Sequence, residues 1–326
     1  MRSVRVASMV GLLALAAAAQ TPPQPDPTAK EPAAPLVFAW PLPATAWVTK
    51  VGTKPTGTAK LRYRIDLAAV AADAAEPDRP VELRLRQTDF SFVEINGQDA
   101  TTEAMQKALA QANALTQAVP DVVVDAAGAF VRIDGLDAMI TRVTEYMATS
   151  KGMTEQQRRR IEFSMKAPTM RATLQQSCGD DWNLWVGAWV GTALRPGESL
   201  RGEGNLPVLT TTLPGTTTMQ HHGEVEGRPG CVRLTRTVVV EGDEATARFA
   251  AAIKKMAAAG GKPPVEFDQL QSMRAELQAE VVVEAATLRP MRATRTKTIR
   301  MQVEGQEPRE QVETATFEFE WLPAGR

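Results

Sequence analysis

The most constraining feature of this sequence is a strict alternation of apolar and polar residues near its C-terminus. From position 273 to 285 every odd residue is apolar, as Met273, Ala275, Leu277, Ala279, Val281, Val283 and Ala285. Most of the even positions between them carry charged or amide side chains. Successive side chains of a strand point to opposite faces, so the pattern predicts a long strand with one face in the core and one in water.

Two further segments extend this strand into an antiparallel meander over about residues 270–322. Residues 315–321 repeat the alternation with Ala315, Phe317, Phe319 and Trp321. The segment between the two alternating runs is basic and carries Arg292, Arg295, Lys297 and Arg300. Opposite charges on neighbouring strands stabilise a pair by roughly 0.2–1 kcal/mol, so we expect this basic strand to lie between two acidic ones.

The rest of the chain places strands before and after a helical middle. Alternation over 61–67 and 81–86 predicts two half-buried strands, with a bend where the apolar phase shifts to Phe90 and Phe92. Between about 102 and 195 we expect a helix over 102–117, a hairpin over 122–133, a helix capped by Asp134, a capping box at 154–157 and a break or new helix at Pro168. A further helix, over 243–259, interrupts the later strands.

This segregation predicts an α+β fold rather than alternating α/β units. We expect a long, curved antiparallel sheet, an open half-barrel, packed on the central helices. Residues 37–326 would form it as a single domain.

The N-terminus is typical of an exported protein. Arg2 and Arg5 precede a short apolar run over 10–16 and three alanines at 17–19, which predicts a cleaved signal peptide over residues 1–19. Residues 20–36 are rich in proline and are predicted to be a disordered linker. We therefore expect a periplasmic or secreted protein with no membrane span in the mature chain.

Charge excludes one class of partner. With Arg2 and Arg5 removed, the 37 basic residues of the full chain fall to 35, against 38 acidic residues. Nucleic-acid binders neutralise phosphates with a basic excess, which this chain does not have. We expect no nucleic-acid partner.

The chain has two cysteines, Cys178 and Cys231. In an oxidising compartment an even count favours a disulfide, and this one would close a long loop worth roughly 4 kcal/mol. The alternative is two buried thiols, since sequence does not give the distance between them.

Motifs for catalysis and metal binding are scarce. His221 and His222 are adjacent, so on a strand they point to opposite faces, and the sequence has neither a His-Glu-x-x-His nor a Gly-x-Ser-x-Gly motif. Asp180 and Asp181 suit the first turn of a helix. We expect no metal and no cofactor, and a non-enzymatic protein in preference to an exported hydrolase that uses carboxylates or His222.

Three tryptophans recur at helical spacing, Trp182, Trp185 and Trp189. Such a stripe can form the wall of a cavity that binds an apolar ligand. It can also anchor a helix in the core, which is the more common use of an aromatic stripe. Both alternatives stay open from the sequence.

Three segments carry a resemblance to known proteins. They are KLRYRIDL with VELRLRQTDFSFVEING, then VVVDAAGAFVRIDGLDAMI, then EAATLRPMRATRTKTIRMQVEG. Together they resemble a family of uncharacterised exported bacterial proteins, and their layout is similar to the periplasmic lipoprotein carriers, in which a half-barrel surrounds helices and an apolar cavity. The resemblance implies an envelope protein that binds a lipid, another apolar ligand or an envelope protein partner in a half-barrel cleft. It implies no catalytic residues, and a structural or interaction module that recruits a partner at its sheet edge is the further alternative.

Overall fold

A computed structural model describes residues 33–70, 81–110, 118–209, 211–259 and 269–323. The described residues belong to one compact unit. The predicted signal peptide and linker residues 20–32 lie outside the described part. The end of the predicted linker is fixed to the fold, because Leu36 donates a backbone hydrogen bond to Thr192 and accepts one from Gly191, both at 2.9 Å.

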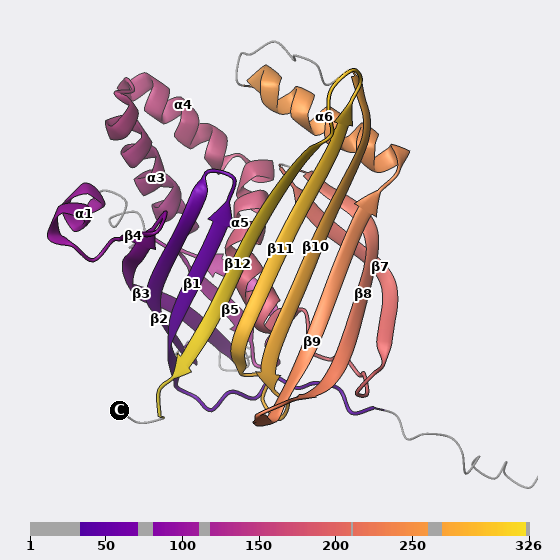
Figure 1. The fold of residues 1–326 in the computed structure, drawn as a ribbon. Coiled ribbons are helices and arrows are strands. Elements are labelled where there is room, and N and C mark those ends of the chain that lie inside the picture. The colour runs from indigo at the N-terminus through magenta and orange to yellow at the C-terminus, as the bar shows by residue number, and fades with distance from the viewer. Residues whose placement is uncertain (1–32, 71–80, 111–117, 210, 260–268, 324–326) are drawn as a thin grey trace, which may run out of the picture. The chain divides into compact units, whose positions relative to one another are not determined.

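The strands form one antiparallel sheet of 12 strands (Figure 1). Their order is β6-β5-β3-β2-β1-β12-β11-β10-β9-β8-β7, and the short β4 pairs with β3 beside this path. Among the described strands β6 and β7 are the two edges, so the sheet is open. The predicted α+β fold with an open, curved antiparallel sheet is confirmed. The strands are β1 Ala44–Lys54, β2 Gly57–Ala69, β3 Glu82–Ile95, β4 Gln98–Asp99, β5 Asp121–Asp125, β6 Phe130–Asp134, β7 Ser199–Val208, β8 Thr211–Val225, β9 Arg228–Glu241, β10 Leu270–Glu284, β11 Pro290–Val303 and β12 Arg309–Trp321.

The two ends of the described chain meet in the middle of the sheet. β1 pairs with β12, in a register that sets Val48 opposite Phe319. The predicted meander is β10, β11 and β12, with the basic β11 between its two neighbours. The expected bend in β3 is also present, as two register shifts in its pairing with β2 and a positive φ of 54° at Asp89.

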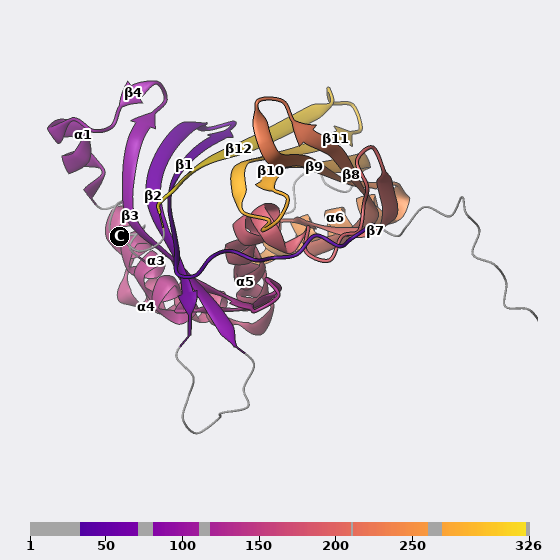
Figure 2. The ribbon, with the colours of Figure 1, turned by 90° about the horizontal axis from the view of Figure 1, so that it is seen from below.

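The helices are α1 Glu103–Ala108, α3 Leu136–Lys151, α4 Glu155–Lys166, α5 Pro168–Trp182, the π-helix η1 Asn183–Gly187 and α6 Asp243–Ala259. Figure 2 shows α5 and α6 on the concave side of the sheet. The capping box at Thr154 is confirmed, and Pro168 begins α5 as its first residue. The helix predicted over 102–117 is present in its first part as α1, and residues 111–117 lie outside the described residues. No helix in the described ranges is long and apolar enough to cross a membrane.

One predicted cap is wrong. The residue before α3 is Gly135, with a φ of 89°, and no side chain caps the helix. Asp134 instead accepts hydrogen bonds from Arg84 at 3.1 Å and Arg132 at 2.9 Å. The carboxylate joins β6 to β3, because charge-assisted hydrogen bonds to arginine are stronger than a cap to a neutral amide.

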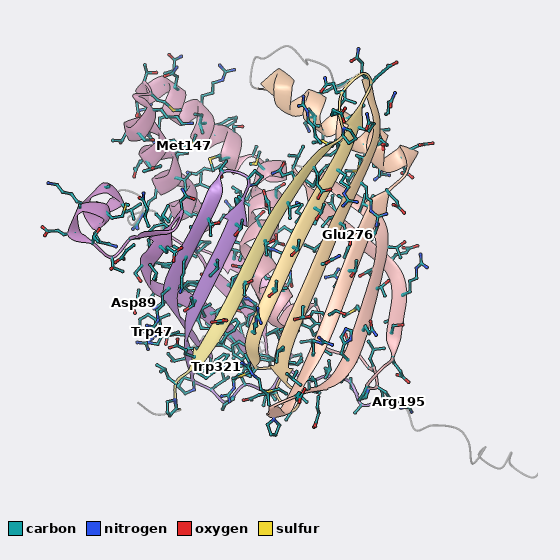
Figure 3. The ribbon with its side chains drawn as sticks, in the orientation of Figure 1. Trp47, Asp89, Met147, Arg195, Glu276 and Trp321 are labelled. Atoms are coloured by element: carbon teal, nitrogen blue, oxygen red, sulfur yellow. The ribbon has the colours of Figure 1, made fainter. Side chains whose placement is uncertain are left out.

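The core on the concave side has two parts. The larger, which we call the α5 core, packs Trp182, Trp185 and neighbouring residues of α5 and η1 against strands from β1 to β12. The smaller, the α6 core, packs Phe249 of α6 against apolar side chains of β7 to β10. The opposite, outer face carries polar side chains, of which Glu276 is labelled in Figure 3.

Candidate functional site

The three predicted tryptophans are core residues. The exposed fractions of Trp182, Trp185 and Trp189 are 0, 0 and 1%. Trp185 packs edge-to-face on Phe317 and Phe319, with ring centroids 5.4 and 5.1 Å apart. A ligand-binding wall needs accessible ring surface, so the structure favours the packing alternative over the ligand-binding one.

The predicted Cys178–Cys231 disulfide is absent from the structure, in which both cysteines are free thiols. Cys178 lies in α5, half-buried against the α5 core, whereas Cys231 is buried at the start of β9, opposite Glu284 of β10. Burial, aided by Asp180 and Asp181, raises the pKa of Cys178 to about 11. The cysteine count allows one disulfide within the chain. It does not give the distance between the two cysteines, on which a disulfide depends.

The two histidines make separate local hydrogen bonds. The Nδ1 atom of His221 accepts a hydrogen bond from the backbone N–H of Gly223 at 2.9 Å, and burial lowers the pKa of this imidazole. The Nε2 atom of His222 lies 2.8 Å from the hydroxyl of Thr235. Within the described residues no group of three His, Cys, Asp or Glu side chains is arranged to hold a metal ion.

The unusual feature of the concave face is a set of cations at positions that otherwise hold core residues. On β9, Arg236 has the same phase as the buried Leu234 and Val238. On β11, Arg295 and Lys297 have the phase of the buried Ala293. We call Arg236, Arg295 and Lys297 the inner cation cluster.

The sheet register brings these three cations together. Ala279 of β10 lies opposite Arg236 on one side and Arg295 on the other, so all three residues share one face. Adjacent strands are about 4.8 Å apart, so only the small side chain of Ala279 separates the two arginines on this face, where Arg236 turns toward Thr217 of β8. Lys297 lies two residues from Arg295 on the same strand, on the same face.

Among the described residues, none of the three cations is matched by a carboxylate at hydrogen-bond distance. Arg236 donates from Nε to the hydroxyl of Thr217 at 3.3 Å, and Lys297 donates to the backbone carbonyl of Pro207 at 2.8 Å. Burial lowers the pKa of both side chains, although Glu313 and Asp180 partly oppose this for Lys297. The ion pairs of Arg295 with Asp180 and Asp181 are long, at 3.9 and 3.8 Å.

Two carboxylates of α5 border the cluster. Asp181 is occupied by Lys50 of β1, whose Nζ lies 2.9 Å from Oδ2. Asp180 is less well paired, and burial raises its pKa to about 6 against the pull of Arg295. Both lie in the last turn of α5 rather than in a first turn, which corrects the prediction from the sequence. The helix already begins at Pro168 and continues into η1.

Two buried donors without a partner lie beside this region. The hydroxyl of Tyr63 and Nε1 of Trp185 have no hydrogen-bond partner among the described residues. Burial, followed by the charge of Asp181, raises the pKa of Tyr63 well above its usual value. Trp185 packs on the ring of Phe317, and Lys50 lies over the same ring at 4.8 Å.

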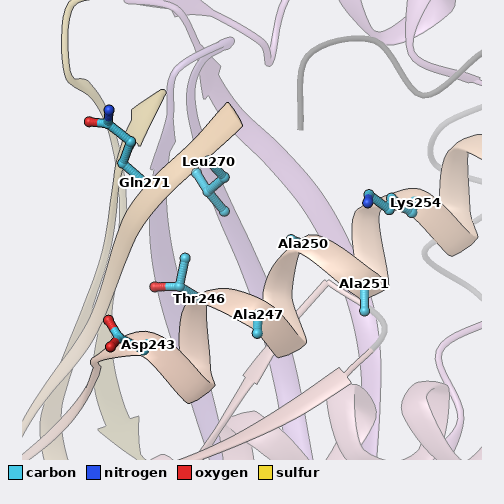
Figure 4. Close-up of a pocket in the computed structure, with 8 residues that line it drawn as sticks. All are labelled: Asp243, Thr246, Ala247, Ala250, Ala251, Lys254, Leu270 and Gln271. Carbon is cyan, nitrogen blue, oxygen red and sulfur yellow. The ribbon is translucent and has the colours of Figure 1, made fainter. Parts of the chain in front are cut away.

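A groove lies elsewhere, along α6 (Figure 4). It has a volume of about 510 Å³ and is lined by small and polar side chains such as Ala247, Ala251 and Thr246, with Leu270 and Gln271 of β10 across from them. Thr246 already makes hydrogen bonds to Gly242 and to the backbone N–H of Met273. Its two charged residues, Asp243 and Lys254, are opposite in sign and about three turns of α6 apart, so the inner cation cluster, with three cations on one face, is the better candidate site.

The sequence pattern alone did not identify the cluster, because β11 was treated as one basic strand and the cations on its two faces were not separated. Arg292 and Arg300 do point outward, where Arg300 forms an ion pair with Glu310 as expected. Arg295 and Lys297 are odd-numbered and have the phase of Ala293, which is the signal that could have separated them. Finding the partner Arg236 required the register of three strands.

No family model matches the chain, and no curated protein matches it. A solved structure described as lipid–protein interactions in lipovitellin is similar at a TM-score of 0.37 and 9% identity, over 87% of this chain but only 25% of that chain. At this TM-score the similarity does not establish a common fold.

Proposed function

We propose that the protein is an exported, non-enzymatic binding protein of the bacterial envelope that binds an anionic ligand at the inner cation cluster. The observation that supports this proposal is the set of three half-buried cations on β9 and β11, for which the described part of the chain offers no carboxylate at hydrogen-bond distance. A charge removed from water is costly unless it is paired. An acidic group that reaches all three cations gains charge-assisted hydrogen bonds.

Three carboxylates lie near the cluster. Glu313 of β12 lies opposite Lys297 and accepts a hydrogen bond from Gln311 at 3.2 Å, and the two of α5 leave Arg295 open to an anion. Asp181 is held by Lys50, so its negative charge is already compensated. Asp180 has a pKa of about 6 and therefore repels an anion less in mildly acidic solution. The side chain of Arg295 is 28% exposed, so a small group in solution can contact it.

The export part of the proposal is supported by the N-terminal sequence. The charged start, the apolar run and the three alanines predict cleavage after residue 19. N-terminal sequencing of the protein from a periplasmic extract tests this directly. An intact Met1 on the extracted protein would contradict the proposed export.

Ligand binding can be tested with an anionic fluorophore, 8-anilinonaphthalene-1-sulfonate. We expect saturable binding, and a rise in Kd on the order of tenfold for Arg295→Gln or Lys297→Gln, since a hydrogen bond to a charged group contributes about 1.5–3 kcal/mol. Arg292→Gln is the matched control, because it removes a cation from the outer face of the same strand. Equal Kd values for all variants would contradict the proposed site.

A second function is favoured by one observation, the pKa of about 6 at Asp180 beside the lysine-paired Asp181. Carboxyl groups with unlike environments can serve as acid and base in hydrolysis. An exported hydrolase would turn over a glycan, ester or peptide substrate, and Asp180→Asn would abolish the activity. Absence of turnover across such a panel, together with anion binding, would favour the binding protein.

A further inference from the structure

The inner cation cluster continues into an apolar path toward one edge of the sheet. Arg236 lies opposite Met219 of β8, and Met219 lies opposite Leu200 of β7. Directly opposed residues of antiparallel strands have side chains on the same face. On the concave face, a line of directly opposed residues thus runs across the strands. It leads from the arginines past Met219 to Leu200 on the edge strand β7.

The two apolar side chains on this line differ from core residues in their exposure. Leu200 is 55% exposed, although it lies on the concave face. Met219 is partly buried, packed against the α5 core. From Arg236 to Leu200 the line crosses two strand spacings, which is about 10 Å.

The neighbouring line of opposed residues begins at Lys297 and also leads from a cation past apolar side chains to the edge strand. Lys297 lies opposite Leu277, which packs against the α6 core. Beyond it the line reaches Val238, Thr217 and then Gly202 of the edge strand. Gly202 has no atom within 4 Å of the position that a Cβ would take, so the space above this part of β7 is open.

We propose that the ligand is an amphiphile with one acidic head group, held by Arg236, Arg295 and Lys297, and one apolar chain that lies over Met219 and Leu200 toward the β7 edge. This inference rests on the proposed function and specifies its ligand class. The cations select the acidic group. An apolar chain attached to that group gains binding free energy where it packs on the exposed leucine and the methionine, because each buried CH₂ contributes about 0.8 kcal/mol.

The test is a titration with inorganic phosphate and a series of n-alkyl phosphates up to dodecyl phosphate, below their micelle concentrations. We expect affinity to rise about fourfold for each added CH₂ that is fully buried. The rise should level off once the chain extends past β7. Leu200→Gln and Met219→Gln should flatten this dependence, while Val312→Gln, on an exposed position of the outer face, should leave it unchanged.

The outcomes separate this inference from the proposed function. If inorganic phosphate binds as tightly as dodecyl phosphate and Arg295→Gln weakens both, the anion site stands and the amphiphile is excluded. If neither ligand binds, both proposals fail. Leu200→Gln changes an exposed side chain and is expected to fold, so an unchanged chain-length dependence in this variant would by itself overturn the proposed chain path.

Discussion

The Nζ atom of Lys50 lies 2.9 Å from Oδ2 of Asp181, which links the central strand β1 to the last turn of α5. The two side chains are 27 and 20% exposed, so water screens the pair only in part. The ammonium group also lies 4.8 Å from the centre of the Phe317 ring. The other oxygen of the Asp181 carboxylate, Oδ1, lies 3.8 Å from Arg295, so Lys50 holds Asp181 more closely than the inner cation cluster does.

Removing one partner of this pair should destabilise the fold. We expect Lys50→Met to lower the free energy of unfolding by about 1–3 kcal/mol, because Asp181 is then left partly buried without its partner. The double variant with Asp181→Asn should recover part of the loss. Urea unfolding of the four proteins of this cycle measures the coupling.

The control pair is Arg62 with Glu320, 2.8 Å apart on the outer face with 43 and 64% exposure. Its removal should change stability by less than about 1 kcal/mol. Equal effects for the two pairs would show that burial does not strengthen the Lys50–Asp181 contact.

Stability should depend on pH through Asp180. Its pKa rises from an ordinary value of 3.8 to about 6 in the folded protein, first through burial. The folded state therefore binds this proton more tightly than the unfolded state, and the resulting stability is fully present below about pH 4 and lost as the pH rises through about 6. In Asp180→Asn this part of the pH dependence should disappear.

The measurement is the urea midpoint of the wild type and of Asp180→Asn between pH 4 and 7. Glu318→Gln, which changes an exposed carboxylate on the outer face of β12, is the control. Parallel curves for wild type and Asp180→Asn would contradict a raised pKa at this position.

Two buried tryptophans should respond differently to the same change. Nε1 of Trp182 donates to the carbonyl of Gly128 at 3.0 Å, whereas Nε1 of Trp185 has no partner in the described structure. We expect Trp182→Phe to cost about 1 kcal/mol more than Trp185→Phe, since only the first change breaks a hydrogen bond. Thermal and urea unfolding of both variants compare them, and a larger loss for Trp185→Phe would contradict this assignment of hydrogen bonds.

The two cysteines should behave as protected thiols. In the native protein Cys231 is buried and the pKa of Cys178 is raised to about 11, so little thiolate forms at neutral pH. We expect slow labelling by a maleimide in the native state and rapid addition of two labels in denaturant without reductant. An unlabelled chain, lighter by two hydrogens, would instead show the disulfide that the sequence alone suggested.

Much of the fold could be predicted because strand periodicity is local. The alternation of β10 and β12, the bend in β3 and the capping box of α4 all follow from side chains within a few residues of one another. Asp134 is a position at which prediction from neighbouring residues was wrong. Its predicted cap competed with two arginines, one of them on a strand 50 residues earlier, and the stronger charge-assisted bonds prevailed.

The candidate site also combines features that follow from local sequence with features that depend on long-range contacts. The sequence by itself determined that Arg236, Arg295 and Lys297 occupy phases shared with buried residues, because side-chain direction on a strand depends only on position. Only the tertiary structure decided that Ala279 lies between the two arginines, that Lys50 occupies Asp181, and that Met219 and Leu200 continue the same line. Pairing register depends on contacts between residues far apart in the chain, and a shift of one residue would move every one of these side chains to the opposite face.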